Sequence, residues 1–434
     1  MNQNKSPDKK PYLGFVPITY NLAETGRAVM IAKRYKELGG KAIFFCHGGE
    51  YEYLPKDQGF EVIKVKPFFT KESVKKIISI NRGEQKGFPY PTSVLREFVQ
   101  NEIEAYKKTG VEMIISTNSL SCVISARAAD IPLVTVTTGL GTFYVSYPEK
   151  FESAVTRLIP QKIKIKLLNL FYTKGKKSLK PYNEIAREYD IKPFRYNSEL
   201  VNGDVTLVTN FIEFINIFPN QQRYPPENYI GIILLDELFK ENIPGEKIKA
   251  INYEIQRHLE KNEKAILLTM GSSGNKELYL DILKALNNTS YRVIAVYTNI
   301  LEESELPKLN NNILLKKYVP SIEKIHKKVD LSIIHGGQGT VYTAAYAGKP
   351  VIGFPMQGEQ HLNLEKMVGH GAGLMMSKKY FNQQLLLDTI KKIFDNYDIF
   401  LNHANKLAQR LPNPEGDKNA AKRILEIATK IKII

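Results

Sequence analysis

Short runs of β-branched and aromatic residues alternate along the chain with longer segments in which apolar residues recur at helical spacing. In the first half, the apolar runs are 12–18, 41–46, 111–117, 132–138 and 204–210. Between the first two runs, Val29, Ala32 and Leu38 are spaced roughly as on one helical face, and Gly39 follows as a helix-ending signal. Strands that alternate with helices are typical of a parallel sheet covered by helices.

A second series of the same kind begins after the turn-rich segment 218–229. Its apolar runs are 264–270, 291–297, 312–318, 330–335 and 349–355. We therefore expect an α/β protein with two doubly wound, Rossmann-like domains, 1–222 and 223–434, that face each other across a cleft. In such domains, ligands bind at the carboxyl ends of the strands. The final segment, 416–434, predicts a helix. This helix can pack on the C-terminal domain or dock back on the N-terminal domain.

Length and composition fit this two-domain interpretation. The chain has 434 residues, of which 43% are hydrophobic and 24% charged, values typical of a folded protein. Lys and Arg number 61 against 45 Asp and Glu, which gives a net charge of +16. This excess suits phosphorylated substrates, anionic lipid headgroups or nucleic acid. No nucleic-acid partner is expected, because the basic residues are spread along the chain and form no recognised motif.

The cysteines and the apolar runs bear on the location of the protein. Cys46 and Cys122 are far apart and have no nearby metal ligands at a known spacing, so neither a disulfide framework nor a zinc site is expected. No apolar stretch approaches the roughly 20 residues of a membrane span. Residues 1–14 lack the apolar core of a signal peptide. We expect a cytoplasmic protein, either free or peripheral on the inner face of the membrane.

Two segments of the second half combine a strand end, glycines, hydroxyls and a helix start. In the first, Gly271, Ser272 and Ser273 follow an apolar run, and a helix begins near Lys276. Backbone N–H groups and the partial positive charge at a helix N-terminus bind anions. An ordinary strand–helix turn uses the same residue types, so this segment alone leaves both interpretations open.

The second segment, 333–340, repeats this arrangement later in the same domain. Its candidate ligand-binding residues are His335, Gly337, Gln338, Gly339 and Thr340. Glycines let the backbone approach a ligand closely, and a hydroxyl at a helix start can bind phosphate. A lone strand-end histidine more often bonds a backbone carbonyl, and that alternative stays open for His335. Two such loops in one sheet predict a ligand with two phosphates.

A third polar segment follows the last apolar run. Glu359, Gln360 and Asn363 come shortly after Pro355. A carboxylate beside an amide can bind neighbouring hydroxyls of a sugar. The alternative is a polar helix start with an acidic first turn. Together with the two phosphate loops, this segment predicts a site for a nucleotide sugar.

Four segments together resemble the nucleotide-sugar-binding half of glycosyltransferase family 1, the UDP-glycosyltransferase-like enzymes with a GT-B fold. They are TMGSSG, YVPSIEKI, IIHGGQGTVYTAAYAGKPVIGFPMQGEQHLN and GAGL. The resemblance implies diphosphate contacts at Ser272, Ser273, His335, Gly339 and Thr340. It also implies that Val319 and Pro320 lie in the loop that lines the base, and that Glu359 and Gln360 hold sugar hydroxyls.

The chain departs from that family at three places. Members commonly have a Gly-His pair after the first strand, whose histidine deprotonates the acceptor, and an aspartate after a later strand that pairs with it. Here Ala23-Glu24 aligns with the pair, and Asn118-Ser119 stands where the aspartate is expected. A glutamate carboxyl with its ordinary pKa of about 4.3 is a weak base. Thr343 replaces an acidic residue that contacts ribose in many members.

Three interpretations follow, which we rank in this order. Glu24 is the general base of an altered enzyme; the acceptor is a phosphate that needs no strong base; or the protein binds a nucleotide sugar without turning it over. The first predicts inverting transfer of a hexose from a nucleoside-diphosphate sugar, with UDP expected, to a hydrophobic or lipid-like acceptor. No cofactor or metal is expected. A nucleotide-sugar 2-epimerase and a non-catalytic nucleotide-sugar-binding protein are the alternatives.

Segment 159–180 contains seven lysines and no acidic residue. Its apolar residues on one helical face are Ile159, Ile163, Leu167, Leu170 and Phe171. A basic amphipathic helix in the acceptor-binding half can lie on an anionic membrane surface and present a lipid acceptor. A helix that turns the same face to the protein core is the alternative, and the alternation of Lys and Ile also weakens the helix prediction.

Overall fold

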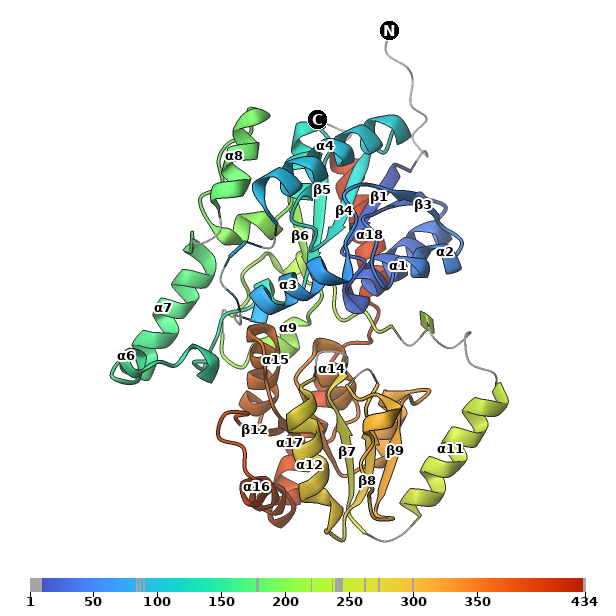
Figure 1. Ribbon diagram of the computed structural model, residues 1–434, viewed down its shortest axis with the longest axis vertical. Coiled ribbons are helices and arrows are strands. Elements are labelled where there is room, and N and C mark those ends of the chain that lie inside the picture. The colour runs from blue at the N-terminus through green and yellow to red at the C-terminus, as the bar shows by residue number, and fades with distance from the viewer. Residues whose placement is uncertain are drawn as a thin grey trace.

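The computed structural model of the chain contains two six-stranded sheets, one in each half (Figure 1). The structure describes residues 10–82, 85, 87–88, 90–176, 179–219, 221–235, 237–238, 245–260, 263–271, 274–298 and 300–431. The neighbouring strands of both sheets pair in parallel, and helices cover the sheets. The predicted fold class, two doubly wound α/β domains, is confirmed.

The N-terminal sheet has the order β3-β2-β1-β4-β5-β6. Its strands are β1 (Tyr12–Pro17), β2 (Lys41–Cys46), β3 (Glu61–Lys64), β4 (Met113–Thr117), β5 (Leu133–Thr137) and β6 (Val205–Val208). Its helices are α1 (Leu22–Glu37), α2 (Tyr53–Asp57), α3 (Lys71–Arg82), α4 (Thr92–Thr109), α5 (Cys122–Ala128), α6 (Ala154–Arg157), α7 (Gln161–Lys174), α8 (Lys180–Glu188) and α9 (Ile212–Ile215). The strand order reverses between β1 and β4, and such a switch point is where open α/β sheets bind ligands.

The C-terminal sheet has the order β12-β11-β10-β7-β8-β9. Its strands are β7 (Ala265–Thr269), β8 (Arg292–Val296), β9 (Ile313–Lys316), β10 (Leu331–Ile334), β11 (Val351–Gly353) and β12 (Gly373–Met375). The helices that follow β6 in this half are α11 (Gly245–Leu259), α12 (Lys276–Asn287), α13 (Ile322–Lys328), α14 (Gln338–Tyr346), α15 (Gly358–Gly369), α16 (Gln383–Asp395), α17 (Tyr397–Arg410) and α18 (Gly416–Ile431). Here the switch point lies between β7 and β10.

The central strands explain why the sequence showed continuous apolar runs. Every residue of β4, β5, β7 and β8 is buried, as expected for parallel strands covered on both faces. The strands β3 and β12 were not predicted. Both are edge strands, and β3 carries exposed charged residues at its two ends, Glu61 and Lys64, so no apolar run marks it.

Helix α18 packs in the N-terminal half although it follows the C-terminal sheet in the chain (Figure 1). Ala421 and Ile424 belong to the same buried cluster as Val29 of α1. Asp417 forms an ion pair with Arg34 of α1, with 2.6 Å between Oδ2 and Nε. The domain division at 222 and 223 stays a prediction. Among the described helices, none has both the length and the apolar content that a membrane span requires.

Candidate active site

At the switch point of the C-terminal sheet, the segments that follow β7 and β10 pack against each other around His335. A Cβ atom at Gly271 would lie 2.9 Å from His335 Cε1, and one at Gly337 would lie 2.5 Å from His335 Nε2. Gly271 and Gly336 also have positive φ angles, 55° and 92°, which glycine adopts most readily. The two segments predicted to hold phosphates are therefore adjacent, and glycine is what lets them enclose the imidazole.

The imidazole of His335 is buried, and its Nδ1 has no hydrogen-bond partner among the described residues. The structure therefore does not contain the alternative arrangement, in which this nitrogen bonds a backbone carbonyl. Burial lowers the pKa of His335 to about 4, so the ring is neutral near pH 7. A neutral imidazole offers one N–H donor and one acceptor. A buried polar atom without a partner is rare in folded proteins, and it marks a position where a ligand can complete the bonding.

Helix α14 begins directly after this loop, and its first residues divide into two groups. Gly339 is exposed, and outside its own helix no group of the described residues comes within 4 Å of a Cβ placed on it, while Thr340 is partly exposed. Gln338 is buried instead. Its Nε2 donates to the carbonyl of Thr209 at 2.7 Å, and its Oε1 accepts from the Thr209 hydroxyl at 3.1 Å. The Gln338 side chain therefore joins the two domains, which leaves its backbone as the part available to a donor.

The other predicted donor residues of this half lie in different surroundings. Ser272 and Ser273 are outside the described residues. The side chain of Val319 is buried in an apolar cluster that includes Ile325, so this side chain supports the loop and does not face a ligand. The next residue, Pro320, lines a cavity of about 730 Å³ bordered by α1, α13 and the start of α18.

The predicted sugar ligands lie at the start of α15, and two of the three hold the site together. Gln360 Oε1 accepts from the backbone N–H of Met356 at 2.7 Å and so caps its own helix. Asn363 Nδ2 donates to the carbonyl of Gly336 at 3.0 Å and fixes the loop beside His335. Of the three, Glu359 is the one that faces the N-terminal domain.

At the switch point of the N-terminal sheet, Glu24 in the first turn of α1 meets Asn118, which follows β4. Asn118 Nδ2 donates to Glu24 Oε1 at 2.8 Å, and Arg27 Nη1 donates to the same oxygen at 2.7 Å. Glu24 and Arg27 are both almost completely buried. The second oxygen, Oε2, is buried and has no partner among the described residues. The two positions at which this chain departs from the family dyad are therefore in direct contact.

The two switch points meet across the interface between the domains. Burial raises the pKa of the Glu359 carboxyl; Arg27 opposes this rise, Glu24 adds to it, and a hydrogen bond with the Thr138 side chain opposes it. A Cβ atom at Gly139 would lie 3.5 Å from Glu359 Cγ, which shows how closely the N-terminal loop approaches α15. The candidate base and the candidate sugar ligand thus lie close enough for their charges to interact.

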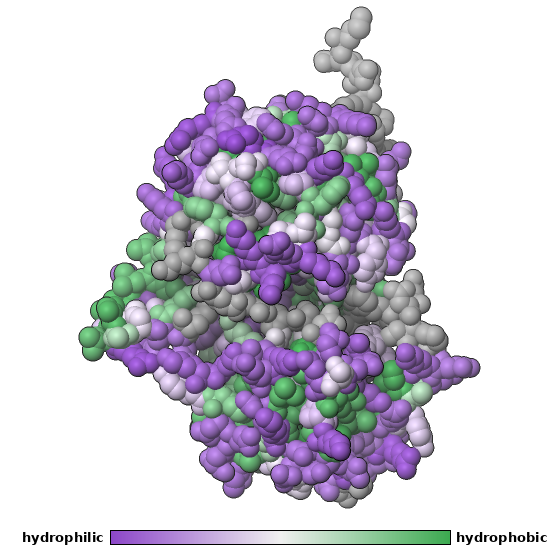
Figure 2. Space-filling view, viewed as in Figure 1, coloured by the Kyte–Doolittle hydropathy of each residue, from purple (hydrophilic) through white to green (hydrophobic). Residues whose placement is uncertain are grey.

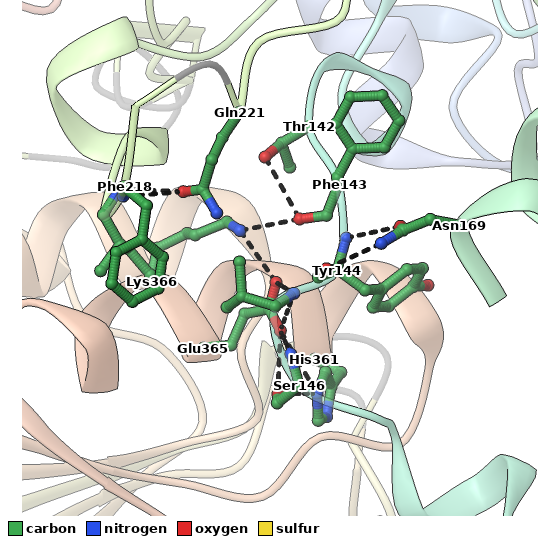
Figure 3. A network of polar contacts seen from close by, with 12 residues as sticks. Thr142, Phe143, Tyr144, Ser146, Asn169, Phe218, Gln221, His361, Glu365 and Lys366 are labelled. Carbon is green, nitrogen blue, oxygen red and sulfur yellow. Dashed lines mark hydrogen bonds and ion pairs between the residues drawn. The ribbon is translucent and has the colours of Figure 1, made fainter. Parts of the chain in front are cut away.

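A buried polar network holds α15 against the N-terminal domain (Figure 3). Glu365 accepts from the backbone N–H groups of Val145 and Ser146, at 3.1 and 2.9 Å, and from the Ser146 hydroxyl at 2.8 Å. Lys366 Nζ donates to the carbonyl of Phe143 at 3.0 Å and to Glu365 at 2.8 Å. His361 Nε2 lies 2.7 Å from the Ser146 hydroxyl. Because each buried charge is paired, this network can fix the position of α15 relative to Glu24.

The sequence pattern alone does not single out Arg27, Glu365 or Lys366. A signal existed for Arg27, because Glu and Arg three residues apart on a helix lie on the same face. No local signal marks Glu365 and Lys366, because the loop that they contact, 143–146, lies about 220 residues earlier in the sequence. Their role is visible only after the two domains are brought together.

Known proteins that resemble the chain agree with this architecture. The family model that matches is the glycosyltransferase family 28 C-terminal domain, over residues 250–424. An uncharacterized UDP-glucosyltransferase of Bacillus subtilis is 28% identical over 56% of this chain, and the match covers 55% of that protein, about half of its length. A PGL/p-HBAD biosynthesis glycosyltransferase of Mycobacterium tuberculosis is 22% identical over 79% of this chain and 76% of its own length.

Solved structures share the fold over nearly the whole chain. The glycosyltransferase of kitacinnamycin superposes with a TM-score of 0.65 at 13% identity and covers 97% of this chain and 99% of its own. The glycosyltransferase VinC, solved in complex with dTDP, has a TM-score of 0.61 at 15% identity and covers 96% of this chain and 100% of its own. The architecture is therefore the GT-B fold.

The fold, the matched family domain and the named relatives together identify the chain as a glycosyltransferase. The match to family 28 is to its C-terminal domain and covers residues 250–424, and the relation to family 1 is a resemblance of motifs only.

Proposed function

We propose that this glycosyltransferase moves a hexose from a nucleoside-diphosphate sugar, with UDP as the nucleotide, to a hydroxyl of a hydrophobic or lipid-like acceptor, with inversion at the sugar carbon. The observation that carries the donor part is the pair of glycine loops that close around His335 at the β7–β10 switch point. The relation to family 1 and a cytoplasmic location, either free or at the inner face of the membrane, are parts of the same proposal.

The donor would lie across the carboxyl ends of β7 and β10. The diphosphate would contact the loop at Gly271 and the first turn of α14, where Gly339 and Thr340 leave room and the helix N-terminus favours negative charge. The neutral His335 would donate its N–H to a phosphate oxygen. Such donors stabilise the leaving diphosphate without a metal ion. Glu359 would accept from sugar hydroxyls.

Nucleotide choice would rest on a different contact than in many family 1 members. Thr343 replaces their acidic ribose ligand, and its hydroxyl donates to the carbonyl of Thr340 at 3.0 Å within α14. A ribose contact would therefore come from elsewhere in the cleft, and dTDP deserves the same experimental trial as UDP.

The chemical step would use Glu24 as general base. Arg27 and Asn118 both donate to Oε1, which would leave Oε2 to take the proton of the acceptor hydroxyl. As that proton leaves, the acceptor oxygen attacks the anomeric carbon from the face opposite the diphosphate. The new C–O bond forms while the bond to the diphosphate breaks, so the configuration is inverted.

A thermal-shift screen with UDP-, dTDP- and GDP-sugars tests the donor site. We expect one class of sugar nucleotide to raise the melting temperature of the wild type, and we expect His335→Ala to bind that donor about ten- to a hundredfold more weakly, because a hydrogen bond to a charged group is lost. Equal donor affinity in wild type and His335→Ala would refute the donor assignment.

The reaction is then tested with the donor that binds best. Mass spectrometry should detect the acceptor with one hexose added, and nuclear magnetic resonance of the product should show the anomeric configuration opposite to that of the donor. Retention of configuration would rule out direct displacement. Isomerisation of the donor sugar with no acceptor present would instead favour an epimerase.

A further inference from the structure

Helix α7 exposes an apolar stripe that a helix covering a protein core would bury. The one side chain of α7 that is buried belongs to Lys164, whose Nζ lies 2.8 Å from Glu152 Oε1 and 4.9 Å from the centre of the Tyr147 ring. The large apolar side chains Ile163, Leu167, Leu170 and Phe171 are 50–55% exposed. A helix of a globular domain normally buries such a stripe. The alternative that this face packs in the core is therefore excluded.

The exposed stripe continues to Val155 of α6, which is 71% exposed, and to Leu158 directly after α6, which is 87% exposed. We call Val155, Leu158, Ile163, Leu167, Leu170 and Phe171 the α6–α7 surface. Figure 2 shows hydrophobic residues gathered at the edge of the molecule where α6 and α7 project in Figure 1. Exposed apolar patches of this extent are typical of interaction sites.

Positive charge surrounds the α6–α7 surface. Lys162, Lys166 and Lys174 of α7 are exposed, and the whole segment 159–180 has no acidic residue. Lys162 and Lys166 each immediately precede an apolar residue of the stripe. A helix with an apolar face flanked by lysines is the pattern that lies in the interface of an anionic bilayer. A second copy of this chain, with its net charge of +16, would instead bring like charges together.

The opposite side of α7 reaches the candidate active site. Tyr172 follows Phe171 directly, and its ring packs edge-on against Tyr144 with centroids 5.5 Å apart. A Cβ atom at Gly139 would lie 3.3 Å from the Tyr172 hydroxyl and 3.5 Å from Glu359 Cγ. Two consecutive residues of one helix therefore face the outer surface and the interdomain cleft, respectively.

We propose that the α6–α7 surface docks on an anionic bilayer, so that the cleft receives its acceptor from the lipid phase along α7. The apolar side chains would enter the boundary between headgroups and acyl chains, while the lysines would lie against lipid phosphates. The delivery of the acceptor rests on the proposed transferase function, whereas the docking itself does not.

Vesicle co-sedimentation of the full chain tests the docking. The two vesicle types are phosphatidylcholine alone and an equal mixture of phosphatidylcholine and phosphatidylglycerol. We expect binding to the anionic vesicles that is at least tenfold tighter than to the neutral ones and that weakens with salt. The double variant Leu167→Ser/Leu170→Ser should lose about tenfold or more, and Lys162→Gln/Lys166→Gln a similar factor on the anionic vesicles only.

Matched controls lie on the other half of the molecule. Ile399→Ser removes an apolar side chain of α17 that is 59% exposed, and Lys247→Gln/Lys249→Gln removes two exposed lysines of α11. Both should bind vesicles like the wild type. Equal binding of wild type and the leucine variant would overturn the proposal, and so would concentration-dependent dimerisation that the leucine variant abolishes while wild type ignores vesicles.

Donor binding separates this proposal from the proposed function. The leucine and lysine variants should keep the thermal shift given by the best sugar nucleotide and should keep transfer to a water-soluble acceptor analogue. Transfer to an acceptor embedded in anionic vesicles should fall with vesicle binding. If transfer from vesicles is unchanged in variants that no longer bind them, delivery along α7 is wrong even though the transferase assignment stands.

Discussion

In the proposed mechanism, the two switch points have complementary tasks, and they are built from different kinds of chemical group. In the C-terminal sheet, glycine backbone, a helix N-terminus and one neutral histidine form the site. In the N-terminal sheet, the site consists of three side chains, Glu24, Arg27 and Asn118, joined by hydrogen bonds. A site made mainly of backbone needs small residues at fixed positions, whereas a site made of side chains changes its chemistry with each substitution. This explains why the C-terminal segments of the chain still resemble the family motif while the two dyad positions differ from it.

Among substitutions at the two switch points, Glu24→Gln should have the largest effect on sugar transfer. An amide of the same shape cannot take a proton, so we expect kcat for transfer to fall about a hundred- to ten-thousandfold while donor affinity changes little. The measurement is steady-state transfer, together with thermal unfolding to show that the buried contact with Arg27 is tolerated. Glu37→Gln, at an exposed position of the same helix, is the matched control. Full transfer by Glu24→Gln would show that the base lies elsewhere.

Buried histidines of the C-terminal half, including His335 at its switch point, should make the stability of the protein depend on pH. His335 has a pKa of about 4 when folded and an ordinary value of 6.5, so between these pH values the unfolded state binds more protons than the folded one. The free energy of unfolding should therefore fall as the pH is lowered from about 6.5 to 4, by up to about 3 kcal/mol from this residue. His326, with a pKa lowered to about 3 by burial, acts in the same direction.

Urea unfolding at pH 7 and at pH 4.5 measures this dependence. The variant His335→Gln should lose less stability between the two pH values than the wild type, because it lacks one of the two buried histidines that gain a proton on unfolding. An identical pH dependence would mean that His335 titrates normally in the folded protein.

A smaller effect should come from Gly339→Ala, which tests the use of backbone in the C-terminal site. In the part of the chain that the structure describes, no group outside the helix itself lies within 4 Å of the new methyl group. Alanine favours a helix by about 0.5–1 kcal/mol over glycine, so the melting temperature should rise slightly. If the diphosphate lies on this turn, the methyl group takes its place and donor affinity should fall about tenfold. Calorimetric titration with the donor checks this, and unchanged affinity would move the diphosphate away from Gly339.

The smallest effect should come from Asn118→Ala. It removes one of the two donors to Glu24 Oε1 and leaves the other, Arg27, in place, so we expect kcat to fall severalfold, up to about tenfold, with KM unchanged. Ser119→Ala, the next residue in the loop, is the control. A loss as large as that of Glu24→Gln would show that Asn118 contacts a reacting group itself.

Much of the fold could be predicted from the sequence because buried parallel strands appear as continuous apolar runs. The ten predicted runs all contain a strand of the structure, and only the edge strands β3 and β12 gave no such run. The two glycine loops beside His335 could be located for a related reason, since glycine is required where they meet the imidazole, whereas their binding of phosphate stays a prediction. The contacts of Gln338 and Val319 could not be predicted. Gln338 bonds Thr209 of the other domain and Val319 packs in a buried cluster, and neither contact leaves a pattern in the neighbouring sequence.

The N-terminal site was predictable only in part. The alignment placed Glu24 and Asn118 at the two dyad positions, and the structure brings them together. The structure adds Arg27 to that pair, and its positive charge balances the negative charge of the Glu24 carboxylate. The spacing of the apolar residues in α7 could not show that their side chains are exposed. An amphipathic helix has the same sequence pattern whether its apolar face packs on a protein core or on a membrane.

Helix α18 makes the N-terminal domain depend on the completion of the C-terminal one. The N-terminal sheet is finished at Val208, yet part of its core, including Ala420 and Ile424, is supplied by a helix that begins at Gly416. During synthesis on the ribosome, the first domain to emerge must wait, with part of its apolar surface uncovered, until the second has been translated. In the nascent chain, this apolar surface therefore stays uncovered for longer than the domain order suggests, and loss of α18 would damage the half of the molecule that was made first.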